Sequence, residues 1–298
     1  MKKSAISLSL VLCLLLAACG APAAPTAAPA EDQTTHIVAT TYPVYLFTTA
    51  VTQGVEGIEV TQLVNQQTAC LHDYTLTVND MTAIEKADVI VMNGAGLADF
   101  MDDALASSSA DVIDASAQHI YLADSDEGGT DPHVWMDPQH AYQMTANIAE
   151  GLMALDPDRG DSYIANMEAV KDAFDLAAPE WTATMSGVTH KELITFHDGF
   201  GYFARHFGLD LLKAIEEEEG AETSAAEIKE IVDLIQTHDI PAIFTEKNGS
   251  DATAQAIARE TGVKVYQLDM IMSGDGTGIQ PYLDAMTADL NTLAEALG

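Results

Sequence analysis

Four residues that can bind a metal ion, His72, His133, His197 and Asp269, each come shortly after an apolar, strand-like run of this 298-residue chain. Consecutive members of the set lie 61, 64 and 72 residues apart. These spacings are far longer than those of zinc fingers, whose ligands come in local pairs. The four side chains could therefore share one ion only if the tertiary structure brings their segments together.

The other metal-capable side chains have simpler interpretations. A single histidine is more often exposed or hydrogen-bonded than a ligand, and we assign that ordinary role to six of the nine histidines: His36, His119, His140, His190, His206 and His238. Cys70 stands two residues before His72 and could be a soft zinc ligand. Because a lone cysteine usually packs as a small hydrophobe, this role for Cys70 is kept as an alternative.

Strand-like and helical patterns alternate in both halves of the chain. The predicted strands are 36–40, 58–63 and 89–92 in the first half, and 193–196, 240–245 and 263–268 in the second. Helical patterns are found at 44–51, 79–86, 200–207, 228–235 and 283–297. Alternation of strands and helices is typical of parallel sheets. The sequence therefore predicts an α/β fold with two lobes, each a parallel-sheet α/β domain.

A long helical pattern separates the two halves. It begins at Asp156-Pro157, a capping residue followed by proline at the first helical position, and apolar residues then recur every three or four positions. Pro179 is expected to kink this helix or, alternatively, to break it into two. The predicted organisation is an N-terminal lobe over 36–155, a linking helix over 156–187 and a C-terminal lobe over 188–298.

This organisation gives the metal-capable residues a common location. In open α/β sheets, ligands bind in the crevice at the carboxyl ends of the strands. Asp269 directly follows the predicted strand 263–268, and His133 lies in the loop after the apolar run 120–122. Because each lobe supplies two of the four residues, we expect them to meet in the interlobe cleft.

The N-terminus has the pattern of an export signal. Lys2 and Lys3 precede the apolar run 6–16, which is too short to span a bilayer comfortably and is followed by small residues and Cys19. This arrangement resembles a bacterial lipobox, which implies removal of residues 1–18 and a lipid on Cys19. The alternative is an ordinary secreted protein with a chance cysteine. Residues 19–35 are rich in Ala, Pro and Thr and are expected to form a disordered tether.

The charge of the chain excludes one class of partner. The formal net charge is −34, and loss of the two signal-peptide lysines would make it −36. Phosphate backbones and anionic lipids would repel such a chain. We therefore expect no nucleic-acid partner and attribute membrane association to the lipid anchor alone.

From His36 to Leu297 the chain resembles the metal-binding solute receptors of bacterial zinc and manganese ABC importers, which are often lipoproteins. The resemblance rests on the segments 70–74, 131–138 and 196–203 and on the acid that follows 265–268, with Asp131-Pro132-His133-Val134-Trp135 as the most specific motif. It implies a metal site made of His72, His133, His197 and Asp269. It also implies a membrane permease as the partner, and we expect the receptor to be a monomer.

The same resemblance favours zinc as the cargo, with a manganese or iron receptor of the same family as the alternative. Three imidazoles and one carboxylate suit four-coordinate zinc, and manganese receptors commonly have a carboxylate where His197 stands. The chain departs from the family pattern at Thr223-Ser224 and at Ala98, and the stretch 123–130 lacks the histidine-rich loop of many zinc receptors. None of these departures falls on a ligand position.

Two other functions compete with this interpretation. An extracytoplasmic zinc hydrolase would need an open coordination position and a base, for which Asp198 or Glu246 could serve. Four protein ligands would close a tetrahedral site, and the chain has no His-Glu-x-x-His segment. We therefore predict a receptor and not an enzyme. An adhesin with an incidental metal is the third possibility, but no feature of the sequence indicates it.

Overall fold

The computed structural model describes residues 34–64, 74–123, 130–216, 223–247 and 249–298. Thr34–Gly298 forms one compact unit. The predicted signal peptide, the predicted lipid-attachment residue Cys19 and the candidate ligands Cys70 and His72 lie outside the described residues. Within the part of the chain that is described, no helix is long and apolar enough to cross a membrane.

The first sheet is parallel and is built from the first third of the chain. Its strands are β1 (Thr35–Ala39), β2 (Ile58–Gln62), β3 (Val89–Met92) and β4 (Asp111–Asp114). Their order is β2-β1-β3-β4, and every neighbouring pair is parallel. The three strands predicted here are confirmed within a residue or two. Strand β4 was not predicted, because only Ile113 of its four residues is buried and no apolar run marks it.

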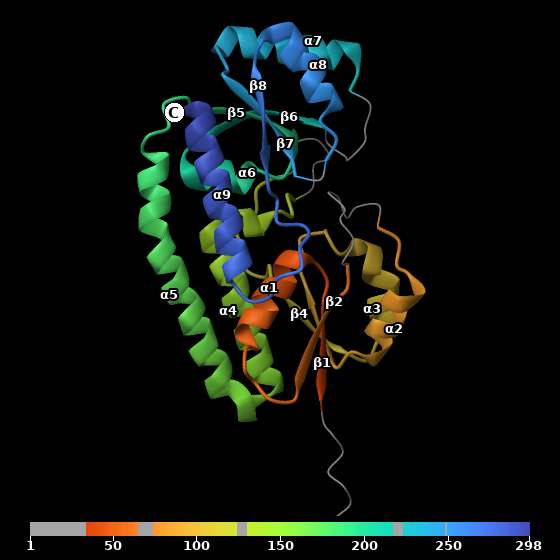
Figure 1. Cartoon of the computed structure of the whole chain (residues 1–298). Helices are drawn as coiled ribbons and strands as arrows, with labels where there is room; N and C mark the ends of the chain where they lie inside the picture. Colours follow the sequence, from red (N-terminus) through yellow and green to blue (C-terminus); the bar gives the residue numbers. More distant parts are fainter. Residues whose placement is uncertain (1–33, 65–73, 124–129, 217–222, 248) are drawn as a thin grey trace, which may run out of the picture. The chain divides into compact units, whose positions relative to one another are not determined.

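Helices cover both faces of this sheet (Figure 1). They are α1 (Tyr42–Val51), α2 (Val78–Lys86), α3 (Asp102–Ser107) and α4 (Pro138–Leu155). Successive strand residues point to opposite faces. In β1, Ile37 and Ala39 accordingly pack in the core that contains α1 and α4, whereas Val38 packs with Ile84 of α2 and Ala104 of α3.

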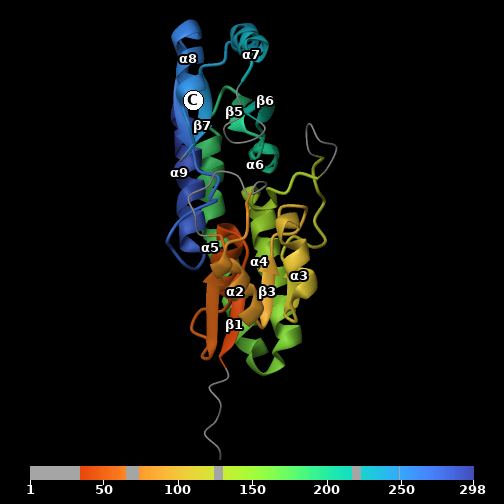
Figure 2. The same cartoon turned by 90° about the vertical axis from the view of Figure 1, so that its right-hand side faces the viewer.

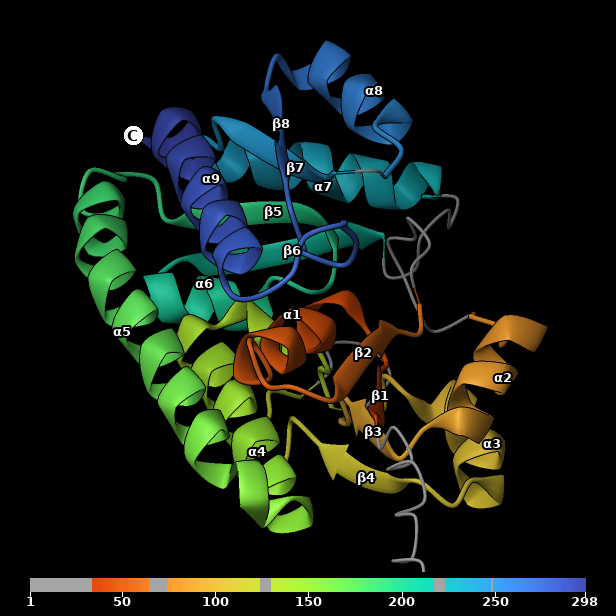
Figure 3. The same cartoon turned by 60° about the horizontal axis from the view of Figure 1, so that its bottom comes forward.

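The second sheet repeats this parallel arrangement. Its strands are β5 (Glu192–His197), β6 (Asp210–Glu216), β7 (Ala242–Glu246) and β8 (Lys264–Leu268), in the order β6-β5-β7-β8. Its helices are α6 (Gly201–Phe207), α7 (Ala225–His238) and α8 (Ala252–Thr261) (Figure 3). Ile194 and Phe196 pack with α7 and α8, whereas Leu193 points to the core that also contains α6. The predicted two-lobe α/β fold is therefore confirmed.

The long helix predicted between the halves is α5 (Gly160–Met185). It begins later than expected, because Pro157–Arg159 form a separate 3₁₀ turn before it. Pro179 lies inside α5, and the helix continues on both sides, so the alternative of two separate helices is wrong. The C-terminal helix α9 (Gln280–Leu297) packs against α5 and α1, and Figures 1 and 2 show it alongside α5. The lobe boundaries given above stay a prediction.

An ion pair joins α6 to the start of α4. The His206 Nδ1 atom lies 2.8 Å from Asp137 Oδ1, and the side chains are 23% and 7% exposed. Asp137 also caps α4 by accepting a hydrogen bond from the Gln139 backbone N–H. Burial alone would raise the pKa of Asp137, but the hydrogen bond and charge of His206, the hydrogen bond from the Gln139 N–H and the charge of His140 together outweigh burial, so the pKa lies below its ordinary value.

Replacing His206 with glutamine is expected to lower the free energy of unfolding by about 1–2 kcal/mol near pH 6. A carboxyl group whose pKa is lowered by folding stabilises the protein above its unfolded pKa of about 3.9, and this contribution disappears as pH falls through the lower folded value. The loss caused by H206Q should therefore shrink at pH 2–3. Urea unfolding at several pH values measures this, with the exposed His238→Gln as the control. Equal losses of unfolding free energy at pH 3 and pH 6 would contradict a stabilising ion pair between His206 and Asp137.

Candidate metal site

His133 is held in one orientation by the aspartate two residues before it. Asp131 Oδ1 accepts hydrogen bonds from the backbone N–H of His133 and from its ring Nδ1, both at 2.9 Å. Both residues are buried, with 7% of Asp131 and 5% of His133 exposed. A carboxylate can only accept, so in the neutral ring the proton is assigned to Nδ1 and the lone pair to Nε2.

The segment around His133 is fixed by side chains from both halves of the chain. Asn93, directly after β3, donates from Nδ2 to the Pro132 carbonyl at 3.0 Å, and the Tyr202 hydroxyl of α6 donates to the Asp131 carbonyl at 2.9 Å. These bonds hold His133 near the carboxyl end of β3. The expectation that His133 follows a strand-like run is wrong: residues 120–122 form no strand, and Ile120 is 80% exposed.

His197 is the last residue of β5. The predicted strand ended at residue 196, so His197 lies inside the strand and not directly after it. Its Nδ1 atom lies 3.4 Å from Oε1 of Glu246, the last residue of β7. Strands β5 and β7 are the central neighbours of their sheet, where the strand order changes direction. His197 therefore lies at the topological switch point, where open α/β sheets bind ligands. Glu246 faces Nδ1, which directs Nε2 of His197 away from it.

The two histidines point their Nε2 atoms at each other. These atoms are 3.3 Å apart, the ring centroids are 5.1 Å apart, and the rings meet edge to face. With both Nδ1 atoms directed at carboxylates, a neutral pair would place two lone pairs in direct opposition. A shared cation removes this repulsion, whether it is a proton or a metal ion.

The spacing of the pair suits a tetrahedral metal ion. Imidazole nitrogens bind zinc at about 2.0–2.1 Å, so two of them at the corners of a tetrahedron lie about 3.3–3.4 Å apart. The observed 3.3 Å agrees with this value. Two carboxylates behind the rings, Asp131 and Glu246, are the kind of outer partner that orients histidine ligands in metal sites.

Trp135 connects the His133 segment to the segment that carries Asp269. Its indole N–H donates to the Met270 carbonyl at 2.9 Å, and its own carbonyl accepts from the Tyr282 hydroxyl of α9 at 2.7 Å. Gly199 leaves space at this point: a Cβ there would lie 2.3 Å from Met270 Cε and 3.1 Å from His133 Cδ2. Met270, one residue after Asp269, thus packs beside the histidine pair.

Asp269 has partners of its own. Its Oδ2 accepts a 3.0 Å hydrogen bond from Lys247 Nζ, and its Oδ1 accepts a 2.8 Å bond from the backbone N–H of Ile271. Ile271 adopts a left-handed conformation, with φ of 60°, which is strained for a β-branched residue and turns the chain sharply after Asp269. The Asp269 N–H donates to the buried Asp289 at 2.9 Å.

A complete set of ligands is not assembled within the described residues. Among these, no three His, Cys, Asp or Glu side chains are grouped closely enough to hold a metal ion. The structure thus brings His133 and His197 together, and it places Asp269 in a separate ion pair with Lys247. The remaining predicted ligand, His72, lies outside the described part of the chain.

Burial raises the pKa of Asp289 well above its ordinary value. Asp289 Oδ1 accepts the Asp269 N–H, so this buried carboxyl supports the turn that carries Asp269. This supporting role was not predicted from sequence, and neither were those of Asn93 and Lys247. The role of Asp131 could have been predicted from sequence, because this residue stands two residues before His133 in the most specific motif of the chain.

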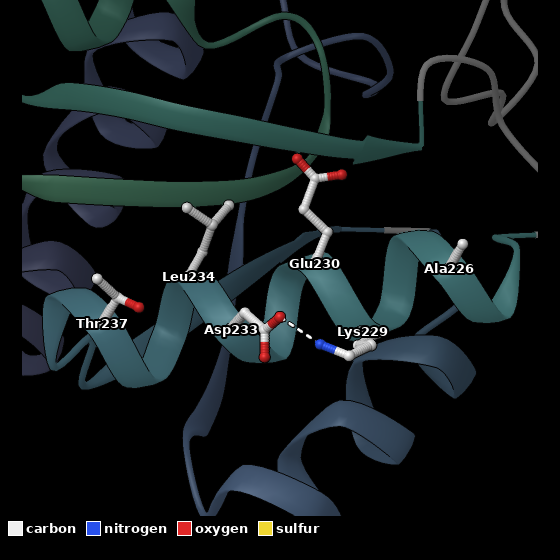
Figure 4. A pocket seen from close by; sticks show the side chains of 6 residues that line it. All are labelled: Ala226, Lys229, Glu230, Asp233, Leu234 and Thr237. Atoms are coloured by element: carbon white, nitrogen blue, oxygen red, sulfur yellow. Dashed lines mark hydrogen bonds and ion pairs between the residues drawn. The ribbon is translucent and has the colours of Figure 1, made fainter.

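A shallow pocket lies on the surface of α7, away from the histidine pair in sequence (Figure 4). All the side chains that line it come from this one helix: Ala226, Lys229, Glu230, Asp233, Leu234 and Thr237. Lys229 and Asp233 form an exposed ion pair one turn apart along the helix. The pocket contains no histidine or aromatic side chain, so it offers no alternative to the histidine pair as a metal site.

Known proteins resemble the chain along most of its length. It is 26% identical over 234 residues to the manganese-binding lipoprotein MntA of Halalkalibacterium halodurans, covering 76% of this chain and 77% of MntA. It is 27% identical over 285 residues to the zinc-binding protein AdcA of Streptococcus pyogenes. That match covers 86% of this chain but only 55% of AdcA, so the chain spans about half the length of this relative.

A solved structure resembles the whole described fold. The crystal structure of the laminin-binding protein Lbp of Streptococcus pyogenes superposes with a TM-score of 0.76 at 32% identity, covering 88% of this chain and 99% of Lbp. One family model matches residues 37–296, which include all but the first two residues of the two sheets, both paired histidines and Asp269. The chain belongs to this family, ZnuA, described as the periplasmic component A of a zinc-uptake complex.

Proposed function

We propose that this protein is an extracytoplasmic receptor that captures one divalent transition-metal ion, preferably zinc, and delivers it to the permease of an ABC importer. His72, His133, His197 and Asp269 would bind the ion. Family membership supports the transport role. The observation that carries the proposal is the buried His133–His197 pair, whose Nε2 atoms have the 3.3 Å spacing of two corners of a zinc tetrahedron.

The donor set favours zinc over manganese. Three imidazoles and one carboxylate match the tetrahedral nitrogen and oxygen ligands of zinc, whereas manganese prefers more oxygen ligands. The relatives include a protein named for manganese, MntA, and one named for zinc, AdcA. Manganese is therefore the second candidate cargo.

Capture without catalysis is the role that we assign to the site. A hydrolase would need a base next to a metal-bound water. Glu246, one of the two candidate bases, contacts His197 through Nδ1, which is the side of the ring away from the metal-binding Nε2. A carboxylate in this place orients a ligand, and four protein ligands would leave no open position for water.

The N-terminal features support a location outside the cytoplasm. We propose that residues 1–18 are removed, that Cys19 carries a lipid and that 19–35 tether a monomeric receptor to the cell membrane. The relative MntA is named as a lipoprotein. Acylation of Cys19 would keep the receptor near the permease, since a chain this acidic has no electrostatic attraction to anionic lipid.

Native mass spectrometry tests the proposal directly. The chain without residues 1–19, purified from a medium that contains several divalent metals, should carry one ion per chain, with zinc predominant. The reason is that the paired imidazoles bind zinc more tightly than manganese. Removal of the ion with a chelator should be reversed by one equivalent of zinc. A folded chain that remains metal-free after this addition would overturn the proposed function.

A further inference from the structure

We propose that Lys247 is a displaceable cation that neutralises Asp269 in the metal-free protein and weakens metal binding by competing for this carboxylate. This inference rests on the proposed function, since it takes Asp269 as a metal ligand. It assigns to Lys247 a specific role in setting how tightly the receptor holds its cargo.

The contacts of Asp269 show where the competition occurs. Oδ1 accepts from the Ile271 backbone N–H, which belongs to the same turn and fixes the orientation of the carboxylate. Oδ2 accepts from Lys247 Nζ at 3.0 Å. A metal ion that binds Oδ2 would therefore take the position of the lysine ammonium, because the backbone bond to Oδ1 can stay in place.

The backbone of Lys247 places it beside Asp269. Lys247 follows the last residue of β7, and its N–H donates to the carbonyl of Leu268, the residue before Asp269, at 2.8 Å. The two side chains thus leave neighbouring strand ends at the same edge of the sheet. This proximity follows from the pairing of β7 with β8 and is not an accident of one side-chain rotamer.

The Lys247 side chain can move away from Asp269. It is 63% exposed, whereas the Asp269 side chain is 23% exposed. An exposed lysine on a flexible stem can move into solvent at low cost, where water replaces the carboxylate. Lysine has no acceptor atom and cannot itself bind a metal cation. Its positive charge can only oppose the ion, through competition for Oδ2 and through repulsion at short range.

Competition from Lys247 should lower the barrier to release of the metal ion from the receptor. When the metal leaves, the ammonium group can return to Oδ2, so that Asp269 does not remain as an uncompensated partly buried charge. Among the described residues, Lys247 is the cation that pairs with Asp269, so without this lysine the metal would take over the neutralisation of the carboxylate. Binding should then be tighter and dissociation slower.

Zinc titration of the mature chain against a chromophoric chelator tests this inference. Lys247→Gln and Lys247→Met, the latter with a stem of similar length, should each bind zinc about three- to tenfold more tightly than the wild type. Lys247→Arg keeps the charge and should stay within about twofold of the wild type. Stopped-flow transfer of zinc to excess chelator should be slower for the two neutral variants.

Lys229→Gln is the matched control, because it removes one lysine from another exposed Lys–Asp pair, on α7 (Figure 4). Its affinity should equal that of the wild type. Affinity in K247Q and K247M that is unchanged or weaker would overturn the inference while leaving the proposed function intact. A wild-type chain that is folded but binds no zinc would overturn the proposed function, and the role of Lys247 with it.

Discussion

Replacing His133 with alanine is expected to weaken zinc binding by about 100-fold or more. The variant loses one of two imidazoles that face each other at 3.3 Å, and Asp131 loses the ring that it orients. Changes to the outer partners of a metal site already cost about 10- to 100-fold, so the loss of a direct ligand should cost at least as much. Competition titration with a zinc chelator of known affinity measures the effect.

His238→Ala provides the control for the His133 variant. His238 ends α7 and is exposed, so its removal should leave zinc affinity unchanged. Circular dichroism of both metal-free variants separates loss of a ligand from loss of structure. If folded His133→Ala binds zinc as tightly as the wild type, the proposed site is wrong, and the metal must bind elsewhere on the chain.

The alternation of strands and helices was predictable because buried parallel strands leave short apolar runs. Strand β3, for example, is the run Val89–Met92, with three of its four residues buried. Helix α4 was missed, although it has a capping aspartate and a proline at its first position. Four of its eight buried residues are alanine or threonine, which give a weak apolar periodicity. The first-lobe helix α2 was predicted over 79–86, and it begins one residue earlier, at Val78, after the capping residue Thr77.

The rule that ligands bind at the carboxyl ends of parallel strands located two of the three predicted ligands that the structure describes. His197 ends β5 and Asp269 follows β8, because parallel strands deliver their carboxyl ends to one edge. His133 does not follow a strand. Its position depends on hydrogen bonds from Asn93 and Tyr202, which lie 40 and 69 residues away in sequence. Such contacts leave no local pattern, so only the motif around His133 pointed to it.

The metal preference of the site should depend on His197. Replacing His197 with glutamate is expected to lower the ratio of zinc affinity to manganese affinity by about tenfold or more, because a carboxylate oxygen replaces a nitrogen ligand that zinc favours. Zinc still binds more tightly than manganese at most sites with mixed nitrogen and oxygen ligands, so the ratio and not the absolute preference is the informative quantity. Isothermal titration with each metal gives both affinities.

The carboxylate of Glu246, beside His197, affects the His197→Glu variant and allows a control variant to be designed. Glu246 lies 3.4 Å from His197 Nδ1, and both side chains are buried. In His197→Glu, two carboxylates would share this space, so the metal-free form should be destabilised and one of the acids should hold a proton. The double variant His197→Glu with Glu246→Gln removes this repulsion and should bind manganese more tightly than the single variant.

His197→Gln separates the two effects of the substitution. It removes the imidazole without adding a charge, so it should weaken both metals and should not gain affinity for manganese. A wild-type protein that already prefers manganese would contradict the assignment of zinc. The same holds if His197→Glu leaves the ratio of the two affinities unchanged, because the ion would then not be bound through the Nε2 atom that faces His133. A gain of manganese affinity with glutamate, set against weaker binding of both metals with glutamine, would show that the side chain at position 197 sets the choice between zinc and manganese.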